Sequence, residues 1–279
     1  MECEKLTGTI GARISGLDLR DVTAEHRGEL RALLEEHLVL FFVGQKMNDH
    51  QFLNFGLAMG ELEITPLLPS LGGDLAAVHT VEVPEGMPRG HFADRWHSDV
   101  SYVANPPYAS ILRPVVLPSI GGDTLWANMY AVYEAMPEPL QQLVSTLNVR
   151  HEAIVGGVVS EYVHPAVRVN PKTGRRALYV NDTFSREVKG YSSLESRKLI
   201  DLLLGMPLRA DVQVRYRWTP DTVAMWDNRF TQHYGTRDYT ERRLLHRMTI
   251  IGEPVLGPHD NLQAPRPASQ VPASTCAQS

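Results

Sequence analysis

The sequence has few cysteines, no long hydrophobic run and no surplus of positive charge. Its two cysteines, Cys3 and Cys276, lie near opposite ends of the 279 residues, which excludes a Cys-x-x-Cys metal site and a disulfide framework. The longest apolar runs, such as Leu38–Val43, are far shorter than the ~20 residues that a membrane-spanning helix needs. Lys and Arg number 27 against 32 Asp and Glu, a net charge of -5, so we expect no nucleic-acid partner. The first residues show no signal-peptide pattern, and we therefore expect a cytoplasmic protein that binds no membrane.

The chain is predicted to form one domain followed by a short tail. No segment rich in Pro, Gly and Ser divides residues 1–257 into two parts, so we expect a single domain there. Residues 258–279 contain several prolines and serines, without periodicity and without large apolar side chains. We expect this tail to be disordered.

Three segments have the sequence pattern of helices. Residues 25–37 repeat leucines at helical spacing. Two further helices are predicted from starts that resemble a capping box, namely Asn48 with Gln51 in 48–58 and Ser192 with Glu195 in 192–205.

Most other apolar segments have the pattern of strands. Residues 38–43 are continuously apolar, which is typical of a strand buried on both faces. Apolar and polar residues alternate in 212–218, the pattern of a half-buried strand. Further strands are predicted at 167–169, 177–180, 223–226 and 244–251. Many strands with few helices predict an α+β, mainly β fold, an antiparallel sandwich or barrel with flanking helices.

One pair of residues suggests a metal site. His97 and Asp99 are two apart, so on a strand they would point to the same face and could hold one metal ion. His233, just past a predicted strand, could supply a third ligand. Two histidines and one carboxylate leave open positions on Fe(II), as oxygenases require. The alternative is that His97 and Asp99 form a solvated or hydrogen-bonded pair without a metal.

Two arginines follow on a later strand. Arg243 and Arg247 are four apart and would therefore face the same way on a strand. A guanidinium matches a carboxylate or sulfonate, and two of them inside a barrel would require anions to neutralise them. The alternative places both arginines on the outer face, beside Asp238 and Glu241.

Several segments, taken in order, resemble one enzyme family. They are Thr9–Ala12, Ser15–Gly16, Trp96–Tyr102, Leu117–Trp126, His164–Pro165, Tyr179–Asn181, Trp226–His233 and Arg242–Arg247. These segments span roughly residues 5 to 257 and are together highly specific. The chain resembles the Fe(II)- and 2-oxoglutarate-dependent dioxygenases typified by taurine dioxygenase, the TauD/TfdA family.

The resemblance implies roles for particular residues. His97, Asp99 and His233 match the iron ligands, while Thr124 and Arg243 match residues that bind 2-oxoglutarate. Arg247 matches the arginine that meets the anionic group of the substrate, expected to be a small alkyl sulfonate, sulfate ester or carboxylate.

The resemblance also implies the fold and the reaction. The expected core is a double-stranded β-helix, or jelly roll, and the expected assembly is a homo-oligomer, a dimer or tetramer. Fe(II), 2-oxoglutarate and O2 would be required, and hydroxylation would release succinate and CO2.

The segment after the second helix differs from that of family members that take taurine. Those members use a His and a Tyr where this chain has Thr65 and Leu68. Losing buried polar partners at ~1–3 kcal/mol each favours a more apolar anion over taurine. Phe184, Tyr102 and Asn128 are further candidates for the substrate pocket, and core packing is the alternative for the two aromatic residues.

Other functions remain open at this point. The same machinery could desaturate or oxidise a specialised metabolite. A jelly-roll protein that binds without catalysis is another alternative, although the intact set of His97, Asp99 and His233 argues against it. A zinc hydrolase would use three such ligands and one open coordination position. The hydrolase alternative leaves Thr124 and Arg243 unexplained.

Overall fold

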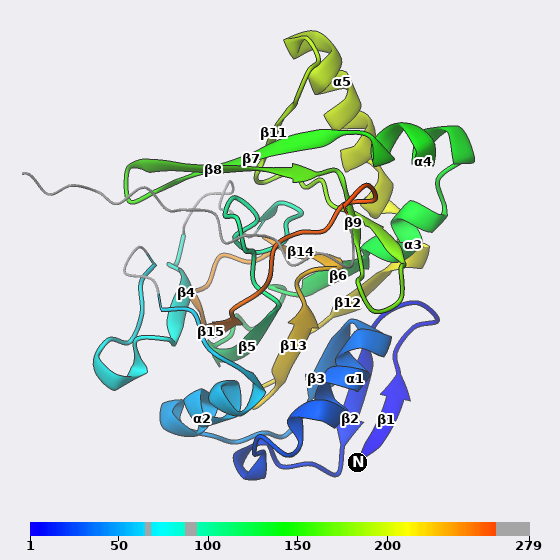
Figure 1. Cartoon of the computed structure of the whole chain (residues 1–279). Coiled ribbons are helices and arrows are strands. Elements are labelled where there is room, and N and C mark those ends of the chain that lie inside the picture. Colours follow the sequence, from blue (N-terminus) through cyan, green and yellow to red (C-terminus); the bar gives the residue numbers. More distant parts are fainter. Residues whose placement is uncertain (65–67, 87–93, 261–279) are drawn as a thin grey trace, which may run out of the picture.

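The computed structural model describes residues 1–64, 68–86 and 94–260, and Figure 1 shows how their elements are arranged. The strands are β1 Glu2–Lys5, β2 Ala12–Ser15, β3 Val39–Phe42, β4 His79–Val83, β5 Ala109–Val116, β6 Thr124–Asn128, β7 Asn148–Val155, β8 Val158–Pro165, β9 Val167–Val169, β10 Arg176–Leu178, β11 Ser185–Val188, β12 Gln213–Tyr216, β13 Val223–Asp227, β14 Thr231–Gly235 and β15 Arg243–Ile250. The α-helices are α1 Arg27–His37, α2 Asp49–Met59, α3 Met129–Glu134, α4 Glu138–Ser145 and α5 Ser193–Leu204. The described part is rich in β-sheet and has few helices, as predicted.

The largest sheet has seven strands in the order β1-β2-β3-β13-β5-β15-β4. Its pairs are antiparallel except for β2 with β3. A smaller antiparallel sheet, β12-β6-β14, lies across from it. The ring of Phe41 on β3 stacks on Tyr216 of β12 at 4.0 Å between centroids, which shows that the two sheets pack face to face.

The position of strand β3, which is packed on both faces, explains why its sequence is continuously apolar. Leu40 and Phe42 pack into a cluster with α1 and α2, whereas Val39 and Phe41 pack into the core between the two sheets. All four side chains are fully buried. Burial on both faces was predicted for 38–43; it is confirmed for 38–42, whereas Val43 lies beyond the strand and is exposed.

The three predicted helices are present. Both capping boxes form: the Asn48 side chain accepts from the Gln51 amide at the start of α2, and Ser192 accepts from Glu195 at the start of α5. The hairpin of β9 and β10 is also present. Figure 1 shows α1 and α2 beside the seven-stranded sheet, while α5 lies next to β11.

Some elements are missed from the sequence. Helices α3 and α4 were not predicted, because α3 has only six residues, most of them buried, and therefore lacks an amphipathic stripe. The long hairpin β7–β8 was also missed; Ile154, Val158 and Val159 near its tip are exposed, so it lacks the alternation that marks a half-buried strand.

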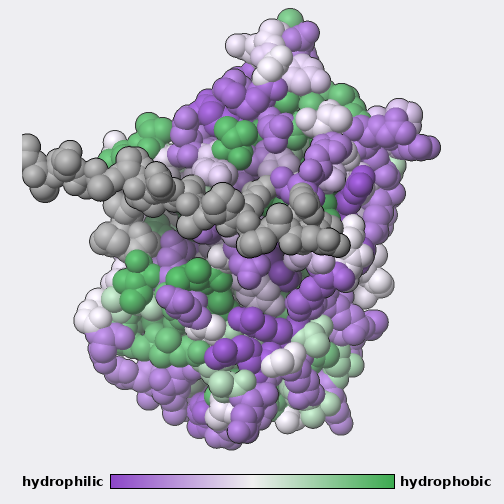
Figure 2. All heavy atoms as spheres, in the orientation of Figure 1, coloured by the Kyte–Doolittle hydropathy of each residue, from purple (hydrophilic) through white to green (hydrophobic). Residues whose placement is uncertain are grey.

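The ends of the predicted domain can be compared only in part. Of the tail, residues 258–260 are described and form a turn after Gly257, while 261–279 lie outside the described residues. None of the helices in the described ranges has the length and apolar character needed to cross a membrane. The view in Figure 2 is mainly hydrophilic, with hydrophobic residues gathered above α2.

Candidate active site

Three side chains that can hold a metal converge between the two sheets. His97 forms an isolated β-bridge with His233 of β14, and Asp99 follows in a turn. The Nε2 atoms of His97 and His233 each lie 3.9 Å from Asp99 Oδ1. All three residues are buried. The expectation that His97 and Asp99 lie on one regular strand is wrong, because the chain turns at Asp99 and Val100 adopts a φ of 51°.

Neighbouring groups hold these side chains in place. His97 Nδ1 lies 2.7 Å from the carbonyl oxygen of Arg95, which accepts its proton, so the lone pair that can coordinate a metal is on Nε2. The Ser110 hydroxyl donates to Asp99 Oδ2 at 2.7 Å. The side chain of Asn228 accepts from the Asp99 amide and donates to the Asp99 carbonyl, at 2.8 and 3.0 Å. The turn that carries Asp99 is therefore fixed at its backbone and at its carboxylate.

The charges of the site favour metal binding. Burial alone would raise the pKa of Asp99, but Arg247, His233 and His97 outweigh burial and hold that pKa well below its usual range. Burial and the neighbouring His97 lower the pKa of His233 to about 3. At neutral pH the carboxylate is therefore ionised and the His233 imidazole is neutral, the forms that coordinate a metal.

The ligand atoms of His97, Asp99 and His233 all lie within 4.8 Å of one another, and Asp99 is close enough to share a cation with each histidine. Two atoms coordinated to one metal at about 2.1 Å each can be separated by no more than about 4.2 Å. Both nitrogen–oxygen separations of 3.9 Å meet this limit. Two imidazoles and one carboxylate are the donor set of Fe(II) sites that keep open positions.

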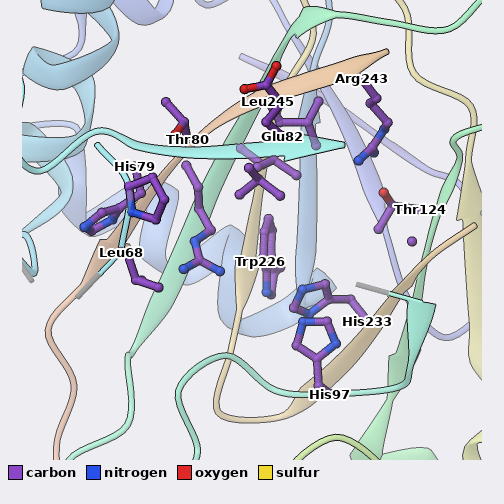
Figure 3. A pocket seen from close by; sticks show the side chains of 15 residues that line it. Leu68, His79, Thr80, Glu82, His97, Thr124, Trp226, His233, Arg243 and Leu245 are labelled. Atoms are coloured by element: carbon purple, nitrogen blue, oxygen red, sulfur yellow. The ribbon is translucent and has the colours of Figure 1, made fainter. Parts of the chain in front are cut away.

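A cavity of about 350 Å³ adjoins these ligands (Figure 3). The two sheets supply its walls, and its lining residues are Leu68, Pro69, His79, Thr80, Val81, Glu82, His97, Leu112, Thr124, Trp226, His233, Gly235, Arg243, Leu245 and Arg247. Figure 3 shows the His97 and His233 rings together at one end, and Arg243 near Thr124.

Arg243 enters this cavity from β15. It is only 4% exposed, and within the described ranges its Nε and Nη2 atoms have no hydrogen-bond partner and no carboxylate forms an ion pair with it. Burial lowers the pKa of its guanidinium. Because a buried, unneutralised cation is costly, this position is suited to an anionic ligand. The alternative that Arg243 and Arg247 lie on the outer face is wrong.

Thr124 and Gly122 shape the same end of the cavity. Trp218 Nε1 donates to the Thr124 hydroxyl at 2.9 Å, so the single hydroxyl proton remains available for another acceptor. Gly122 has a φ of 72°, and a Cβ there would lie 3.0 Å from Pro118 and 3.3 Å from Arg243. A side chain at Gly122 would therefore disturb both the backbone and the Arg243 side chain.

Arg247 lies at the metal end of the cavity. Its Nη1 donates to Asp99 Oδ1 at 2.8 Å, so this guanidinium, unlike that of Arg243, has a carboxylate partner. Burial raises the pKa of Glu63, and the charge of Arg247 in the same corner opposes this rise only in part. A polar, charged corner therefore adjoins the metal ligands.

The other residues predicted to contact the substrate differ in where they lie relative to the cavity. Leu68 lines the cavity, and Phe184 and Tyr102 lie beside it, with Phe184 6.3 Å from His97 and 5.0 Å from Tyr102 between ring centroids. Thr65 lies outside the described residues.

Asn128 needs a correction. It is not among the residues that line the cavity. Its Oδ1 accepts from the amides of Tyr130 and Ala131 at the start of α3, and its Nδ2 donates to the Thr9 carbonyl. Since both ends of the amide are used, we assign Asn128 to capping α3 and not to the substrate.

Three supporting residues were missed as part of the site. Ser110 and Asn228 orient Asp99, and Trp218 orients Thr124. Asn228 lies within a segment that carries the family resemblance, which was the only available signal. Ser110 and Trp218 have no signal in the sequence, because their roles depend on which strands become neighbours.

Comparisons with known proteins agree with this geometry. The family model described as taurine catabolism dioxygenase TauD, TfdA family, matches residues 2–249. The chain is 37% identical to an alpha-ketoglutarate-dependent sulfate ester dioxygenase of Pseudomonas putida, over 92% of this chain and 91% of that protein. It is 35% identical to an alkylsulfatase of Acinetobacter baylyi, over 93% and 87% of the two chains.

Solved structures are also similar. A taurine dioxygenase from Burkholderia xenovorans superposes with a TM-score of 0.81 at 33% identity, covering 92% of this chain and 93% of that one. The structure of AAD-2 in complex with Mn(II) and N-oxalylglycine has a TM-score of 0.79 at 25% identity, covering 91% and 99%. With its two-histidine, one-carboxylate site, the chain belongs to the TauD/TfdA family and is an Fe(II)- and 2-oxoglutarate-dependent dioxygenase.

Proposed function

We propose that this dioxygenase hydroxylates a small organic anion, with alkyl sulfate esters as the first class to test. The carrying observation is that Arg243 and Arg247, on one face of β15, line the same cavity as His97 and His233. Two guanidinium groups beside the metal ligands provide for two anions, the co-substrate and the substrate. The similarity to a sulfate ester dioxygenase and an alkylsulfatase supports this choice.

The residues divide between the two anions. His97, Asp99 and His233 would hold the metal. Arg243 would pair with the distal carboxylate of 2-oxoglutarate, and Thr124 would donate its free proton to that carboxylate. With iron and 2-oxoglutarate bound, the centre supplies oxidation of a C–H bond coupled to formation of succinate and CO2.

Arg247 would orient the substrate. Its guanidinium would pair with the sulfate group while Leu68, Tyr102 and Phe184 contact the alkyl chain, so that the carbon next to the ester oxygen faces the metal. Hydroxylation of that carbon gives an adduct that carries both a hydroxyl and a sulfate. The C–O bond to sulfate then breaks, and the hydroxyl loses its proton, which releases an aldehyde and hydrogen sulfate. An apolar Leu68 favours such a substrate over taurine.

The proposal also covers the fold, the extent of the domain and the oligomeric state. We propose a double-stranded β-helix formed by the seven-stranded sheet and β12-β6-β14, and a single domain over 1–257. A homo-oligomer, a dimer or tetramer, in the cytoplasm remains our expectation from the family resemblance. Sedimentation analysis would test the oligomeric state.

The test is coupled turnover with a panel of anions. The purified protein with Fe(II) and 2-oxoglutarate is given alkyl sulfates, the matched sulfonates and carboxylates, and taurine. We expect succinate formation, oxygen uptake and sulfate release in equal amounts with alkyl sulfates. Equal or faster turnover of taurine would contradict the substrate assignment.

A matched pair of variants tests the role of Arg247. Arg247→Met should raise the KM for the anionic substrate more than the KM for 2-oxoglutarate. Arg242→Met, which removes an exposed arginine paired with Glu82, is the control and should change neither. Equal effects of both variants would exclude Arg247 as the substrate-binding residue.

A further inference from the structure

A second cavity, of about 270 Å³, lies apart from the active site. It is bounded by α1, β9 and the segments around Tyr108, Arg229 and 251–256, and it shares no lining residue with the first cavity. In Figure 1 the hairpin that contains β9 comes down towards α1, and Figure 2 shows mainly hydrophilic residues on the face above α1. Nothing in the proposed reaction uses this cavity.

Arg168 of β9 is the most buried charged group of this second cavity. It is 4% exposed, and its guanidinium lies 5.4 Å from the Tyr179 ring centroid and 5.7 Å from that of Phe230. Within the described ranges, its Nη1 atom has no hydrogen-bond partner and no carboxylate pairs with it. Aromatic faces stabilise such a cation only in part, so the charge is left without its usual anion.

Arg31 and Tyr108 add polar groups to the same wall. Arg31 lies 4.8 Å from the Tyr108 ring centroid and donates to the Met59 carbonyl at 2.9 Å, while its Nε is buried without a partner in the described part of the chain. The Tyr108 hydroxyl is likewise buried without a partner there. Each of these groups can donate a hydrogen bond to an anion.

The charges around this cavity do not balance. Of its four cationic side chains, Arg229 forms an ion pair with Asp227, and Lys172 with Glu35. Glu253, the remaining lining carboxylate, is exposed. The cations of Arg31 and Arg168 are therefore left without a carboxylate partner among the described residues.

We propose that this cavity is a second anion site, which takes a small oxyanion between Arg168, Arg31 and the Tyr108 hydroxyl. Guanidinium groups bind sulfate, phosphate and carboxylate through the same paired N–H donors, so the shared chemistry is that of an oxyanion. The source is either an inorganic anion or a short carboxylate such as succinate.

Thermal unfolding tests this site in solution. The full chain is saturated with Mn(II), 2-oxoglutarate and a short alkyl sulfate to occupy both anion positions of the active site, and sulfate, phosphate or succinate is titrated against chloride at constant ionic strength. We expect a saturable rise in Tm, because an anion that binds only the folded chain stabilises it. The anion that acts at the lowest concentration identifies the source, and a rise no larger than that with chloride overturns the proposal.

Matched variants locate the effect. Arg31→Gln should weaken the affinity for the anion about tenfold, as expected for one lost charge-assisted hydrogen bond. Arg209→Gln removes an exposed arginine paired with Asp211 and should leave the affinity unchanged. If both variants respond alike, the proposal fails. Arg31 is used because Arg168 also packs against the Tyr179 and Phe230 rings, so replacing it would disturb that packing as well.

Diffraction provides a direct readout. Crystals grown with selenate, whose selenium scatters anomalously, should show a peak within hydrogen-bond distance of Arg168 and Arg31. Anomalous density confined to Arg243 and Arg247, or absent from both cavities, would overturn the second site without affecting the proposed reaction.

Discussion

Strand β15 presents two different faces. On one face Arg243, Leu245 and Arg247 line the cavity beside the metal ligands. On the other, Met248 and Ile250 pack against the helix-covered core. The helix-covered face is buried, and its one histidine, His246, is paired with Asp49, whereas the cavity face leaves the guanidinium of Arg243 without a protein anion in the described part of the chain.

The difference shows how one strand serves stability and chemistry together. Side chains alternate between the two faces of a strand, so a single strand can carry both functions without conflict. The helix-covered face stabilises the sheet by burying apolar area. This stabilisation offsets the cost of keeping the buried guanidinium of Arg243 on the cavity face. Substitutions on the two faces should therefore change different measurements.

The largest effect is expected on the cavity side, at the metal. Asp99→Asn removes the only charged ligand among the three. Loss of a group that merely supports a ligand lowers affinity or activity about 10–100-fold, so loss of the ligand itself should exceed that range. Iron content and succinate formation measure the effect, and an equal loss in the surface variant Arg209→Gln would point to general damage instead. Turnover within about tenfold of the parent chain would show that Asp99 is not a ligand.

The two faces of β15 can be separated directly by a pair of variants. Met248→Ala should lower the free energy of unfolding by about 2–5 kcal/mol, because it removes a fully buried side chain, and should leave the KM for 2-oxoglutarate unchanged. Arg243→Met should raise that KM roughly tenfold or more and leave stability nearly unchanged, because it removes a buried charge that has no carboxylate partner among the described residues. Denaturant unfolding and steady-state kinetics on both variants test this, and a KM change in Met248→Ala would break the separation.

The two faces of β15 also illustrate which features can be predicted from the sequence alone. Local patterns predicted the capping boxes of α2 and α5 and the doubly buried β3, because each depends on residues a few positions apart. Asp99 was expected on a strand and lies in a turn, since the turn is fixed by Asn228, which is 129 positions away in the chain. Asn128 was predicted to contact the substrate because its side chain is polar, but it caps α3. That helix is too short and too buried to be predicted from the sequence.

Replacing Ser110, whose hydroxyl donates to the Asp99 carboxylate, should have a smaller effect than replacing Asp99 itself. Ser110→Ala removes the hydrogen bond to Asp99 Oδ2, which should weaken Fe(II) binding about 10–100-fold with little change in the KM for 2-oxoglutarate. Ser110 lies on β5 next to β13, so the loss of one hydroxyl should leave the sheet intact. Iron titration followed by activity measures the affinity. An unchanged iron affinity would show that Arg247 and Asn228 are sufficient to orient Asp99 without Ser110.

The smallest effect belongs to the helix-covered face, where His246 lies beneath α2. Its Nδ1 is 2.8 Å from Asp49 Oδ1, as expected for a structural histidine, and burial lowers its pKa although Asp49 opposes this. The unfolded chain therefore takes up a proton at a higher pH than the folded chain does. The stability that depends on neutral His246 is present above about pH 6.5 and is lost as the pH falls below it, by less than about 1.4 kcal/mol per pH unit. His246→Gln should flatten this part of the stability profile between pH 7 and 5 without changing the pH dependence of iron binding. Identical slopes in the two proteins would place the acid sensitivity elsewhere, and a changed iron profile would show that the two faces of β15 are coupled.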